Sequence, residues 1–529
     1  MERAAPKEAL LGKRPRSSPA SKNRESGPSG KRSTPAAIRY LIIAAISLVV
    51  LFLFVKPLYV VPDSAAYLAY GRSILWDGDV DFENDYARLG MVDLGVGGSE
   101  LGATTSTGKR GNPFGIGAAF LWLPFMIVVA IVAKIAALLG ADVATDGFGM
   151  ATLWAAHIGT WSCLAAAFAL VLRTAKEFFG GSGAVPRKAA LAGAFLGTPL
   201  VYYVLQAPSY SHACSVFSVS LLFYLAMRFR EAWTPRRALM LGAAAGLTAL
   251  VRTQGVVFWV VPLILGWKAL RSEGAAAFWK RVGLYAAGAA VLFAPQLVAW
   301  TVIYGSPWHL PQGEGFLHFS FRRLMSVAFS ARHGLFSWSP VFALAAAGWV
   351  MALRRREWRA PAAAILAAFA LQWFVNTLPN DWWAGWSFGA RRFIDFVPFA
   401  AVGLLVFCMA GIAARVAVYA VTALNLVQWL RISTGGISGE TDPGWNALWG
   451  SGFLSSLGKI PAALWSVLSA SPTDLQVLRR PSAVPPTLYS DPAGLFDAFF
   501  FLWAVLVLLA VFKTYRWWGG FAYSADKDA

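Results

Sequence analysis

Long apolar stretches separated by short polar ones run through most of the chain. After residue 40, apolar runs recur that are long enough to cross a bilayer as α-helices. The first, Leu41–Val55, ends in Lys56-Pro57 without a small-residue cleavage site, which predicts a retained first span and not a removed signal peptide. The other predicted spans lie at 149–172, 189–206, 212–228, 238–251, 255–271, 282–304, 335–353, 360–376, 393–411, 415–431 and 496–512.

One further apolar run, 114–139, decides the topology, because each crossing reverses the sidedness of everything after it. If this run lies along the outer leaflet, the segments on the cytoplasmic side hold thirty Lys and Arg residues. If it crosses, twenty of them move outside, against the positive-inside rule. The pattern therefore predicts an all-α polytopic membrane protein of about twelve transmembrane helices, with an interfacial helix at 114–139 and both termini in the cytoplasm.

The polar segments complete the predicted organisation. Residues 1–39 form a basic tail that is too poor in apolar residues to fold. The membrane module covers 40–431 and includes a long first outward loop at 57–148. A second outward loop at 432–495 is predicted to be a small cap or a disordered segment. The last transmembrane helix and a cytoplasmic tail occupy 496–529.

Composition agrees with a place in the membrane. Of 529 residues, 57% are hydrophobic and 14% are charged, whereas soluble domains are about 25% charged. This excludes a soluble enzyme, a disordered chain and a disulfide scaffold. The formal net charge of +19 comes from the cytoplasmic segments. It is therefore an orientation signal, and no nucleic-acid partner is expected.

The first outward loop begins with candidate chemistry. Asp63 precedes a segment whose apolar spacing predicts a short surface helix, so it is either a general base or the N-cap of that helix. The later string Asp77-Gly78-Asp79-Val80-Asp81 lacks the Gly and the closing Glu of a calcium loop, which favours a solvated acidic turn. Lys109, with Arg110, either meets a lipid phosphate or anchors the interfacial helix.

Four arginines lie at the outer ends of spans, where this topology otherwise carries few positive charges. A guanidinium fork matches phosphate oxygens and keeps its charge when partly buried. The alternative is an internal ion pair with Asp381 or Asp395, and the three-residue spacing of Arg392 and Asp395 suits one. Arg332 has no acid nearby in the sequence, which favours a phosphate ligand. The four arginines are Arg252, Arg332, Arg391 and Arg392.

Histidines and tryptophans occupy the same outward segments. His212 begins a span, as a capping or hydrogen-bonded core histidine or as a catalytic one. His333 directly follows Arg332. The string Asp381-Trp382-Trp383-Ala384-Gly385-Trp386 combines an acid with three tryptophans. An interfacial aromatic belt is the default for such residues, and stacking on a sugar is the alternative.

These strings resemble the GT-C superfamily of membrane glycosyltransferases, and within it the bacterial branch near the protein O-mannosyltransferases and the lipid A aminoarabinose transferases. The resemblance covers about residues 40–411. The strings that carry it are Pro62-Asp63, Tyr67-Leu68, Arg72-Ser73-Ile74, Asp77-Gly78-Asp79, Asn112-Pro113-Phe114-Gly115-Ile116-Gly117, Tyr210-Ser211-His212, Ala331-Arg332-His333-Gly334-Leu335-Phe336 and Trp386-Ser387-Phe388-Gly389-Ala390-Arg391-Arg392-Phe393.

The resemblance implies a GT-C-like fold with interfacial helices in the first loop. It also implies transfer of a sugar from a polyprenyl-phosphate-linked donor on the outer face of the membrane, with Asp63 as the base. Transfer further needs positive charge on the departing phosphate, which Arg332 with Arg391 or Arg392 would supply without a metal. Attack opposite the phosphate would invert the anomeric centre. The other expected substrate-binding residues are His333, Arg252, Lys109, His212 and Tyr67.

Several points stay open at the level of sequence. Many members of the superfamily carry a second acid directly after the first, where this chain has Ser64. No cofactor is expected, although a role for a divalent cation is left open, and the acceptor is a protein, a lipid or a glycan. The expected location is the inner membrane of a bacterium, with the active site on the periplasmic face. The alternatives are a lipid-linked saccharide transporter or flippase, and a non-catalytic membrane scaffold.

Overall fold

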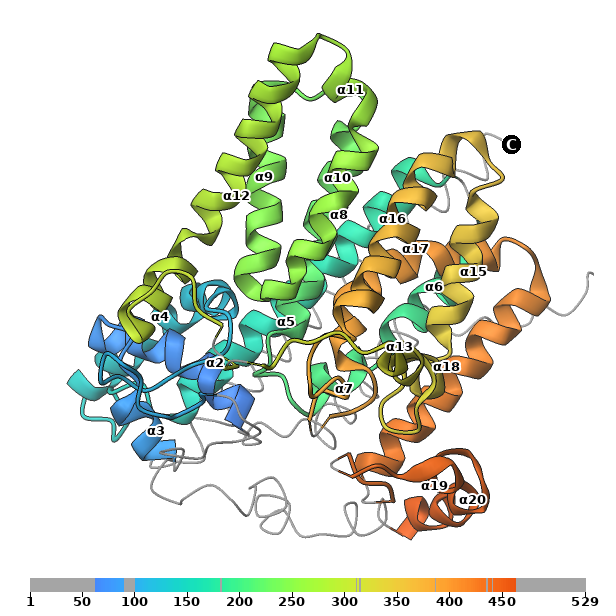
Figure 1. The fold of residues 1–529 in the computed structure, drawn as a ribbon. Coiled ribbons are helices and arrows are strands. Elements are labelled where there is room, and N and C mark those ends of the chain that lie inside the picture. The colour runs from blue at the N-terminus through green and yellow to red at the C-terminus, as the bar shows by residue number, and fades with distance from the viewer. Residues whose placement is uncertain are drawn as a thin grey trace, which may run out of the picture. The chain divides into compact units, whose positions relative to one another are not determined.

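The computed structural model describes most of the chain between residues 62 and 462, and the regular elements there are helices (Figure 1). Two isolated β-bridges, Thr104–Arg110 and Leu317–Pro379, accompany them in this part of the chain. The prediction of an all-α fold is confirmed for these residues. The structure describes residues 62–89, 100–180, 183–310, 312–313, 315–385, 387–433, 436–439 and 441–462.

The apolar runs within the described residues coincide with helices, although several runs are divided into shorter pieces. In chain order the elements are α2 (Pro62–Arg72), η1 (Ser73–Asp77), α3 (Glu83–Leu89), α4 (Gly117–Leu138), α5 (Met150–Phe178), α6 (Ala184–Leu196), α7 (Leu200–Leu205), α8 (His212–Phe229), α9 (Pro235–Val251), η3 (Thr253–Trp259), α10 (Val260–Leu265), α11 (Trp267–Arg271), α12 (Ala275–Tyr304), α13 (Phe321–Phe329), α14 (Leu335–Trp338), α15 (Val341–Ala352), α16 (Arg356–Val375), η4 (Arg391–Phe396), α17 (Val397–Cys408), α18 (Ile412–Ser433), α19 (Gly444–Trp449) and α20 (Ser451–Leu457).

Six of the described helices are long and apolar enough to cross a membrane, which indicates a multi-pass membrane protein. They are α4, α5, α8, α12, α16 and α18. The predicted count of about twelve is not confirmed, because α9, α15 and α17 are shorter and other runs are broken. The predicted first and last spans, 41–55 and 496–512, lie outside the described residues, as do the tail at 1–39 and the loop beyond residue 462.

The breaks have local causes. Pro199 stands between α6 and α7, and Pro340 stands between α14 and α15. Proline has no N–H to donate and clashes with the preceding turn, so it starts a helix but does not continue one. Between α10 and α11, Gly266 lies against Trp233, where an added Cβ would come within 2.1 Å of the indole nitrogen. Close packing therefore requires glycine at this break.

The helices α9 and α12 pack side by side through small residues. A Cβ added at Gly242 of α9 would stand 2.0 Å from the carbonyl oxygen of Tyr285, and one added at Gly288 of α12 would stand 2.4 Å from that of Leu239. Glycines at such a contact let two backbones approach closely. The two helices run in the same direction, so α9 and α12 end on the same side as the first outward loop.

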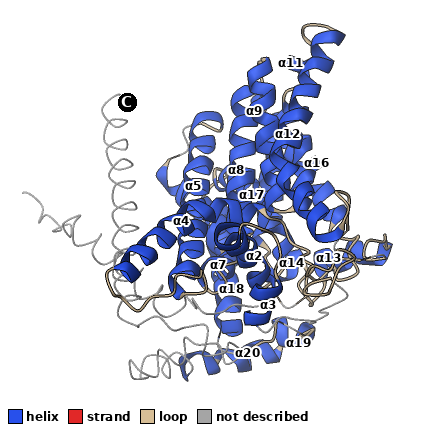
Figure 2. Cartoon of the chain, turned by 90° about the vertical axis from the view of Figure 1, so that its left-hand side faces the viewer, coloured by secondary structure: helices blue, strands red, loops and turns tan. Residues whose placement is uncertain are grey.

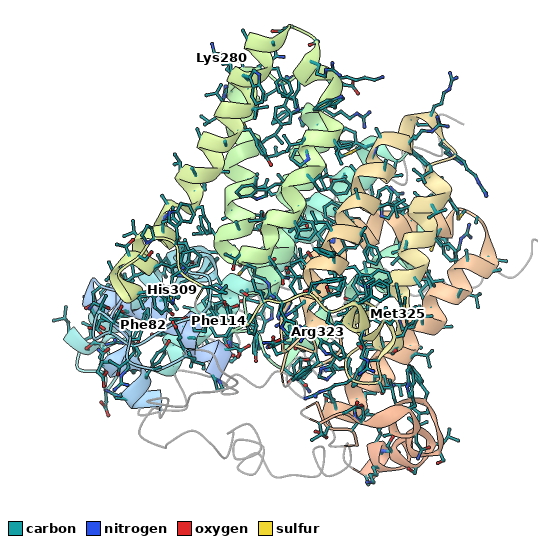
Figure 3. The ribbon with its side chains drawn as sticks, viewed as in Figure 1. Phe82, Phe114, Lys280, His309, Arg323 and Met325 are labelled. Carbon is teal, nitrogen blue, oxygen red and sulfur yellow. The ribbon has the colours of Figure 1, made fainter. Side chains whose placement is uncertain are left out.

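The two ends of the upright helices carry different groups. Figure 3 shows Lys280 at one end of α12 and His309 near its other end, with Arg323 farther from α12 on the same side as His309. Near the Lys280 end, Arg228 of α8 pairs with Glu177 of α5 at 3.4 Å. In Figure 1, α2, α3, α7, α13, α19 and α20 lie toward the other end, and α11 lies at the Lys280 end. The segments predicted to face outward thus gather on one side.

Both flanks of α4 contact the same short stretch of chain. Before α4, the amide of Asn112 donates to the carbonyl of Ala66 in α2 at 2.8 Å. After α4, the indole N–H of Trp76 in η1 donates to the carbonyl of Thr145 at 3.0 Å. In Figure 2, α4 runs across the view and not parallel to the upright α9 and α12. By length and composition α4 suits a crossing, so its surface position stays a prediction.

The described part of the predicted cap is attached to the last turn of α18 by one buried cation. Arg431 is fully buried, and its guanidinium donates to the carbonyls of Ala447 and Leu448 and, at 2.5 Å, to the hydroxyl of Ser456. These acceptors belong to α19 and α20. A buried guanidinium is tolerated here because several acceptors satisfy its donors.

Replacing Arg431 by methionine is expected to release the cap without unfolding the helices beneath it. The substitution keeps an apolar stem but leaves buried carbonyls without a donor, at about 1–3 kcal/mol. Hydrogen exchange should rise over α19 and α20 and stay unchanged in α8 and α9. Arg415→Met, at the other end of α18, serves as the matched control. Unchanged exchange in the cap of the Arg431 variant would show that other contacts hold it.

Candidate functional site

The first turn of α2 is joined to η4, more than three hundred residues away. Arg391 of η4 donates to Oδ2 of Asp63 at 2.8 Å. Among the described residues, the other oxygen of this carboxylate has no hydrogen-bond partner. As described, α2 begins at Pro62, which places Asp63 inside the first turn and not at the N-cap. Asp63 is therefore tied to a cation of the site.

A second group comes from the ends of α8 and α9. Arg252, which follows α9, pairs with Asp395 of η4 at 3.3 Å and lies 3.3 Å from Nδ1 of His212. Since arginine only donates, this ring nitrogen accepts. Gln254 also donates to Asp395, at 2.5 Å. His212 is fully buried and stacks on Tyr210, so it is a hydrogen-bonded core histidine bound to a site arginine.

The suggested pairing of Arg392 with Asp395 is wrong. Arg392 pairs with Asp381 at 2.7 Å and also donates to its carbonyl oxygen at 3.1 Å. Asp395 has no exposed surface and is occupied by Arg252, which reaches it from the end of α9. Asp395 and Arg392 therefore lie on different sides of η4 and have different partners. The expected internal ion pairs with Asp381 or Asp395 are found for Arg392 and Arg252, whereas Arg391 pairs with Asp63.

Arg332 differs from the other three arginines. Its guanidinium carbon lies 3.9 Å above the centre of the Trp383 ring, and no described acid lies within ion-pair distance. A guanidinium stacked on an indole keeps its edge free for hydrogen bonds while its face is held. Of the four, Arg332 has the geometry that best suits an anionic ligand.

His333, the next residue, is held from one side. Its Nδ1 lies 2.9 Å from the carbonyl oxygen of Trp383 and 3.0 Å from the hydroxyl of Ser387. The other ring nitrogen, Nε2, is buried without a hydrogen-bond partner among the described residues. Burial lowers the pKa of His333 to about 4, so the imidazole is neutral at pH 7. It therefore carries no charge for binding phosphate.

A small cavity lies where these elements meet. Its volume is about 10 Å³, roughly that of one water molecule. The cavity joins residues from the segments 305–334 and 377–392, which are predicted to face outward, with the start of η4. Its walls include His333, Asn376, Trp382, Trp383, Arg391 and Arg392.

The helix α13 supports this wall. Its Arg323 donates to the carbonyls of Leu378 and Pro379, each at 3.2 Å, and to the amide oxygen of Asn380 at 2.9 Å. Figure 3 shows Arg323 close to Met325 on the same side of the molecule. These bonds fix the segment that leads into Asp381. The bridge between residues 317 and 379 adds a further link.

Tyr67 and Lys109, also expected to bind substrate, are placed differently. Tyr67 is buried beside Phe114 and lies within the electrostatic reach of Asp63, Arg252 and Arg391. It therefore belongs to the cluster. Lys109 instead pairs with Asp81 of the acidic turn at 2.9 Å, which lowers the pKa of that carboxyl. The Lys109–Asp81 pair therefore links two parts of the first loop to each other.

The acidic turn is cross-linked by bases and is not simply solvated. Arg72 of α2 bridges Asp77 and Asp85, the latter at 3.3 Å. Asp79 accepts from the hydroxyl of Ser73 at 2.6 Å. The described residues contain no group of three or more His, Cys, Asp or Glu side chains suited to a metal. The acids here position the loop that carries Asp63.

Asp85 is expected to make the stability of this loop depend on pH. It is buried, and burial raises the pKa of its carboxyl from 3.8 to about 7, against the effect of Arg72. The folded state then binds the proton more tightly than the unfolded state. Stability should therefore fall as pH rises from about 4 to 7, by at most about 4 kcal/mol. Thermal unfolding at pH 5 and pH 8 measures this loss, which Asp85→Asn should remove. Equal pH dependence in both proteins would contradict it.

Several residues around the site arginines were not predicted from the sequence to belong to the site. Gln254 and Gln372, from η3 and α16, both donate to the carbonyl of Arg392, at 2.9 and 2.8 Å. Gln372 lies in an apolar run and is fully buried, which could have marked it, since a buried amide needs partners. Ser387, beside His333, lies in a string that the family resemblance includes.

The structure thus brings together Asp63, Tyr67, His212, Arg252, Arg332, His333, Arg391 and Arg392, and leaves Lys109 with a separate partner. Comparison of the sequence with protein-family models and with curated proteins finds no match in either set.

Proposed function

We propose that the protein is an integral membrane glycosyltransferase. It would transfer a sugar from a polyprenyl-phosphate-linked donor to an acceptor on the outer face of the membrane. The observation that carries the proposal is the contact between Asp63 and Arg391, beside three further arginines. One site then holds both a carboxylate for the acceptor and fixed positive charge for the departing phosphate.

The chemistry divides between these groups. Asp63 receives the proton of the acceptor nucleophile through the oxygen that Arg391 leaves free. Arg332, held by its stacking on Trp383, stabilises negative charge on the lipid phosphate as the glycosidic bond breaks. Ser64, which stands where many superfamily members carry a second acid, is fully buried. Base catalysis therefore rests on Asp63 alone.

The contacts around α4 support an interfacial position for this helix. A 22-residue helix is about 33 Å long. Only about six residues separate the end of α4 from Thr145, whose carbonyl accepts a hydrogen bond from Trp76 of η1. Before α4, Asn112 contacts α2, which leads directly into η1. An extended chain of about six residues covers at most about 22 Å. A return across the bilayer is too long for it, so both flanks of α4 belong to the outer side.

The placement of charge favours an enzyme over a transporter. In the described candidate spans α5, α8, α12, α16 and α18, the charged residues lie in the terminal turns. Transporters place ionisable groups near the middle of the membrane. The site arginines instead gather at the outward ends of the helices, where a lipid phosphate group resides.

The proposal is tested by incubating the purified full-length protein, in lipid nanodiscs, with undecaprenyl phosphate linked to glucose, mannose or arabinose. Cell-envelope extract supplies the acceptor. Release of undecaprenyl phosphate together with a glycosylated product is the expected result. Movement of the intact lipid-linked sugar across a vesicle membrane without its cleavage would identify a flippase. If neither cleavage nor movement is observed, the non-catalytic scaffold remains.

A further inference from the structure

We propose that α13 lies in the plane of the membrane surface, with its exposed apolar side chains inserted among the acyl chains of the lipids. These side chains, Phe321, Met325 and Phe329, form the apolar stripe of α13. The leaflet concerned is the one on the side predicted to face outward. This contact with lipid is independent of the reaction proposed above.

The exposed side of α13 is apolar. Phe321, Met325 and Phe329 are 76%, 57% and 51% exposed. Their spacing of four residues places them along one side of an α-helix. The polar residues of α13 occupy the neighbouring arc: Arg322, Arg323 and Ser326. A short helix with Phe and Met on one side and Arg on another is typical of helices that lie in a membrane interface.

The position of α13 along α16 sets its depth. The 20 residues of α16 are about 30 Å long as a helix, which matches the hydrocarbon core of a bilayer. Trp373, in the last turn of α16, donates its indole N–H to the carbonyl oxygen of Leu324 in α13 at 2.9 Å. In Figure 1, α13 lies toward the end of α16 that is away from α11. The backbone of α13 therefore lies at the level where α16 leaves the hydrocarbon.

The apolar surface of α16 continues toward α13. From residue 361 to 375 the exposed residues of α16 are all apolar, and they lie on one face: Ala363, Ala367, Ala370, Leu371 and Phe374. In a membrane span such a face contacts lipid. The ring of Phe374 stacks on that of Phe319, which is half-exposed and lies two residues before α13, with the ring centres 5.7 Å apart. The lipid-facing surface thus extends to the start of the stripe, which favours lipid over a separate protein as the occupant.

A different side of α13 carries its bonds to the candidate site. Arg323 donates to the carbonyl of Pro379 at 3.2 Å and to the amide oxygen of Asn380 at 2.9 Å. The next residue, Asp381, pairs with Arg392. The helix therefore connects the bilayer to this wall of the site, and insertion of the stripe holds the wall at the membrane surface.

Spin labelling of the full-length protein in lipid nanodiscs tests the contact with lipid. Single cysteines replace Met325 or Phe321, and the three native cysteines are buried. Ala367→Cys, on the exposed face of α16, is the reference for lipid, and Glu231→Cys, in the exposed loop after α8, is the reference for water. We expect the ratio of collisions with oxygen to collisions with a water-soluble nickel chelate to be at least about threefold higher at both stripe positions than at Glu231→Cys.

The other outcomes contradict the proposal. A ratio equal to that of Glu231→Cys at both stripe positions would place the stripe in water. Low collision rates with both reagents would show that a protein surface covers the stripe, either a second copy of this chain or another partner. Either result would overturn the contact with lipid.

Met325→Glu tests the consequence for the site wall. A carboxylate among acyl chains is costly, so α13 should leave the lipid and loosen the bonds of Arg323. We expect the amides of residues 377–383 to exchange hydrogen about tenfold faster in nanodiscs, with no change in α9. Met325→Leu, which keeps the stripe apolar at similar volume, is the matched control and should exchange as the wild type does. Unchanged exchange in Met325→Glu, or equal acceleration in both variants, would overturn the link between lipid and the wall.

Discussion

Asp63→Asn is expected to abolish sugar transfer in a protein that still folds and inserts. The amide can accept the hydrogen bond from Arg391, so the contact between α2 and η4 is retained in part. It cannot take a proton from the acceptor, and losing a general base costs about 10²–10⁴-fold. The measurement is the rate of undecaprenyl phosphate release at saturating donor, together with the thermal unfolding temperature.

Asp77→Asn is the matched control for this substitution. Asp77 is also a carboxylate of the first outward loop that pairs with an arginine, Arg72, but it lies in the acidic turn. Its variant should stay within about threefold of the wild-type rate. Equal losses in both variants would indicate that Asp63 acts through the structure of the loop. Full activity of Asp63→Asn would refute its assignment as the base.

Arg332→Ala is expected to lower kcat by about 10²–10³-fold, the usual cost of losing one donor to a charge that develops in the transition state. KM should change less, because the phosphodiester of the donor carries one negative charge throughout and the departing phosphate gains a second only as the bond breaks. Arg332→Lys should recover part of the rate. Lysine keeps the charge but loses the planar fork and its stacking on Trp383. Steady-state kinetics with the preferred donor separates the two parameters.

Arg322→Ala provides the control for Arg332. Arg322 is an exposed arginine of α13, ten residues earlier in the same outward loop. Its loss should leave kcat unchanged. If Arg332→Ala raises KM alone, the residue binds ground state and transition state equally, and it has no role in stabilising the leaving group.

The sequence predicts which residues belong to the candidate site better than it predicts their ion-pair partners. Arginines at the predicted outer ends of apolar runs are unusual, and this feature of the sequence alone singles out Arg252, Arg332, Arg391 and Arg392. Arg332 was marked by the lack of an acid nearby in the sequence, and the described structure places none within ion-pair distance. Spacing failed for Arg392, because Asp395 faces the buried side of η4 and Asp381 comes from a different segment.

Helix boundaries show the same limit. Apolar runs predicted where helices occur, because burial or lipid contact requires backbone hydrogen bonds to be satisfied within the chain. They did not predict that 255–271 divides into η3, α10 and α11. The break between α10 and α11 coincides with the close approach of Gly266 to Trp233, which lies between α8 and α9. Such a contact leaves no periodic signal in either segment.

The sequence by itself indicated a helical multi-pass membrane protein, and it predicted the side on which positive charge gathers and the residues suited to chemistry, because hydropathy and charge act locally along the chain. The tertiary structure decided which of those residues meet. It joined Asp63 to Arg391 and Lys109 to Asp81, and it stacked Arg332 on Trp383. Those pairings depend on distances between helices far apart in the chain, and packing alone sets them.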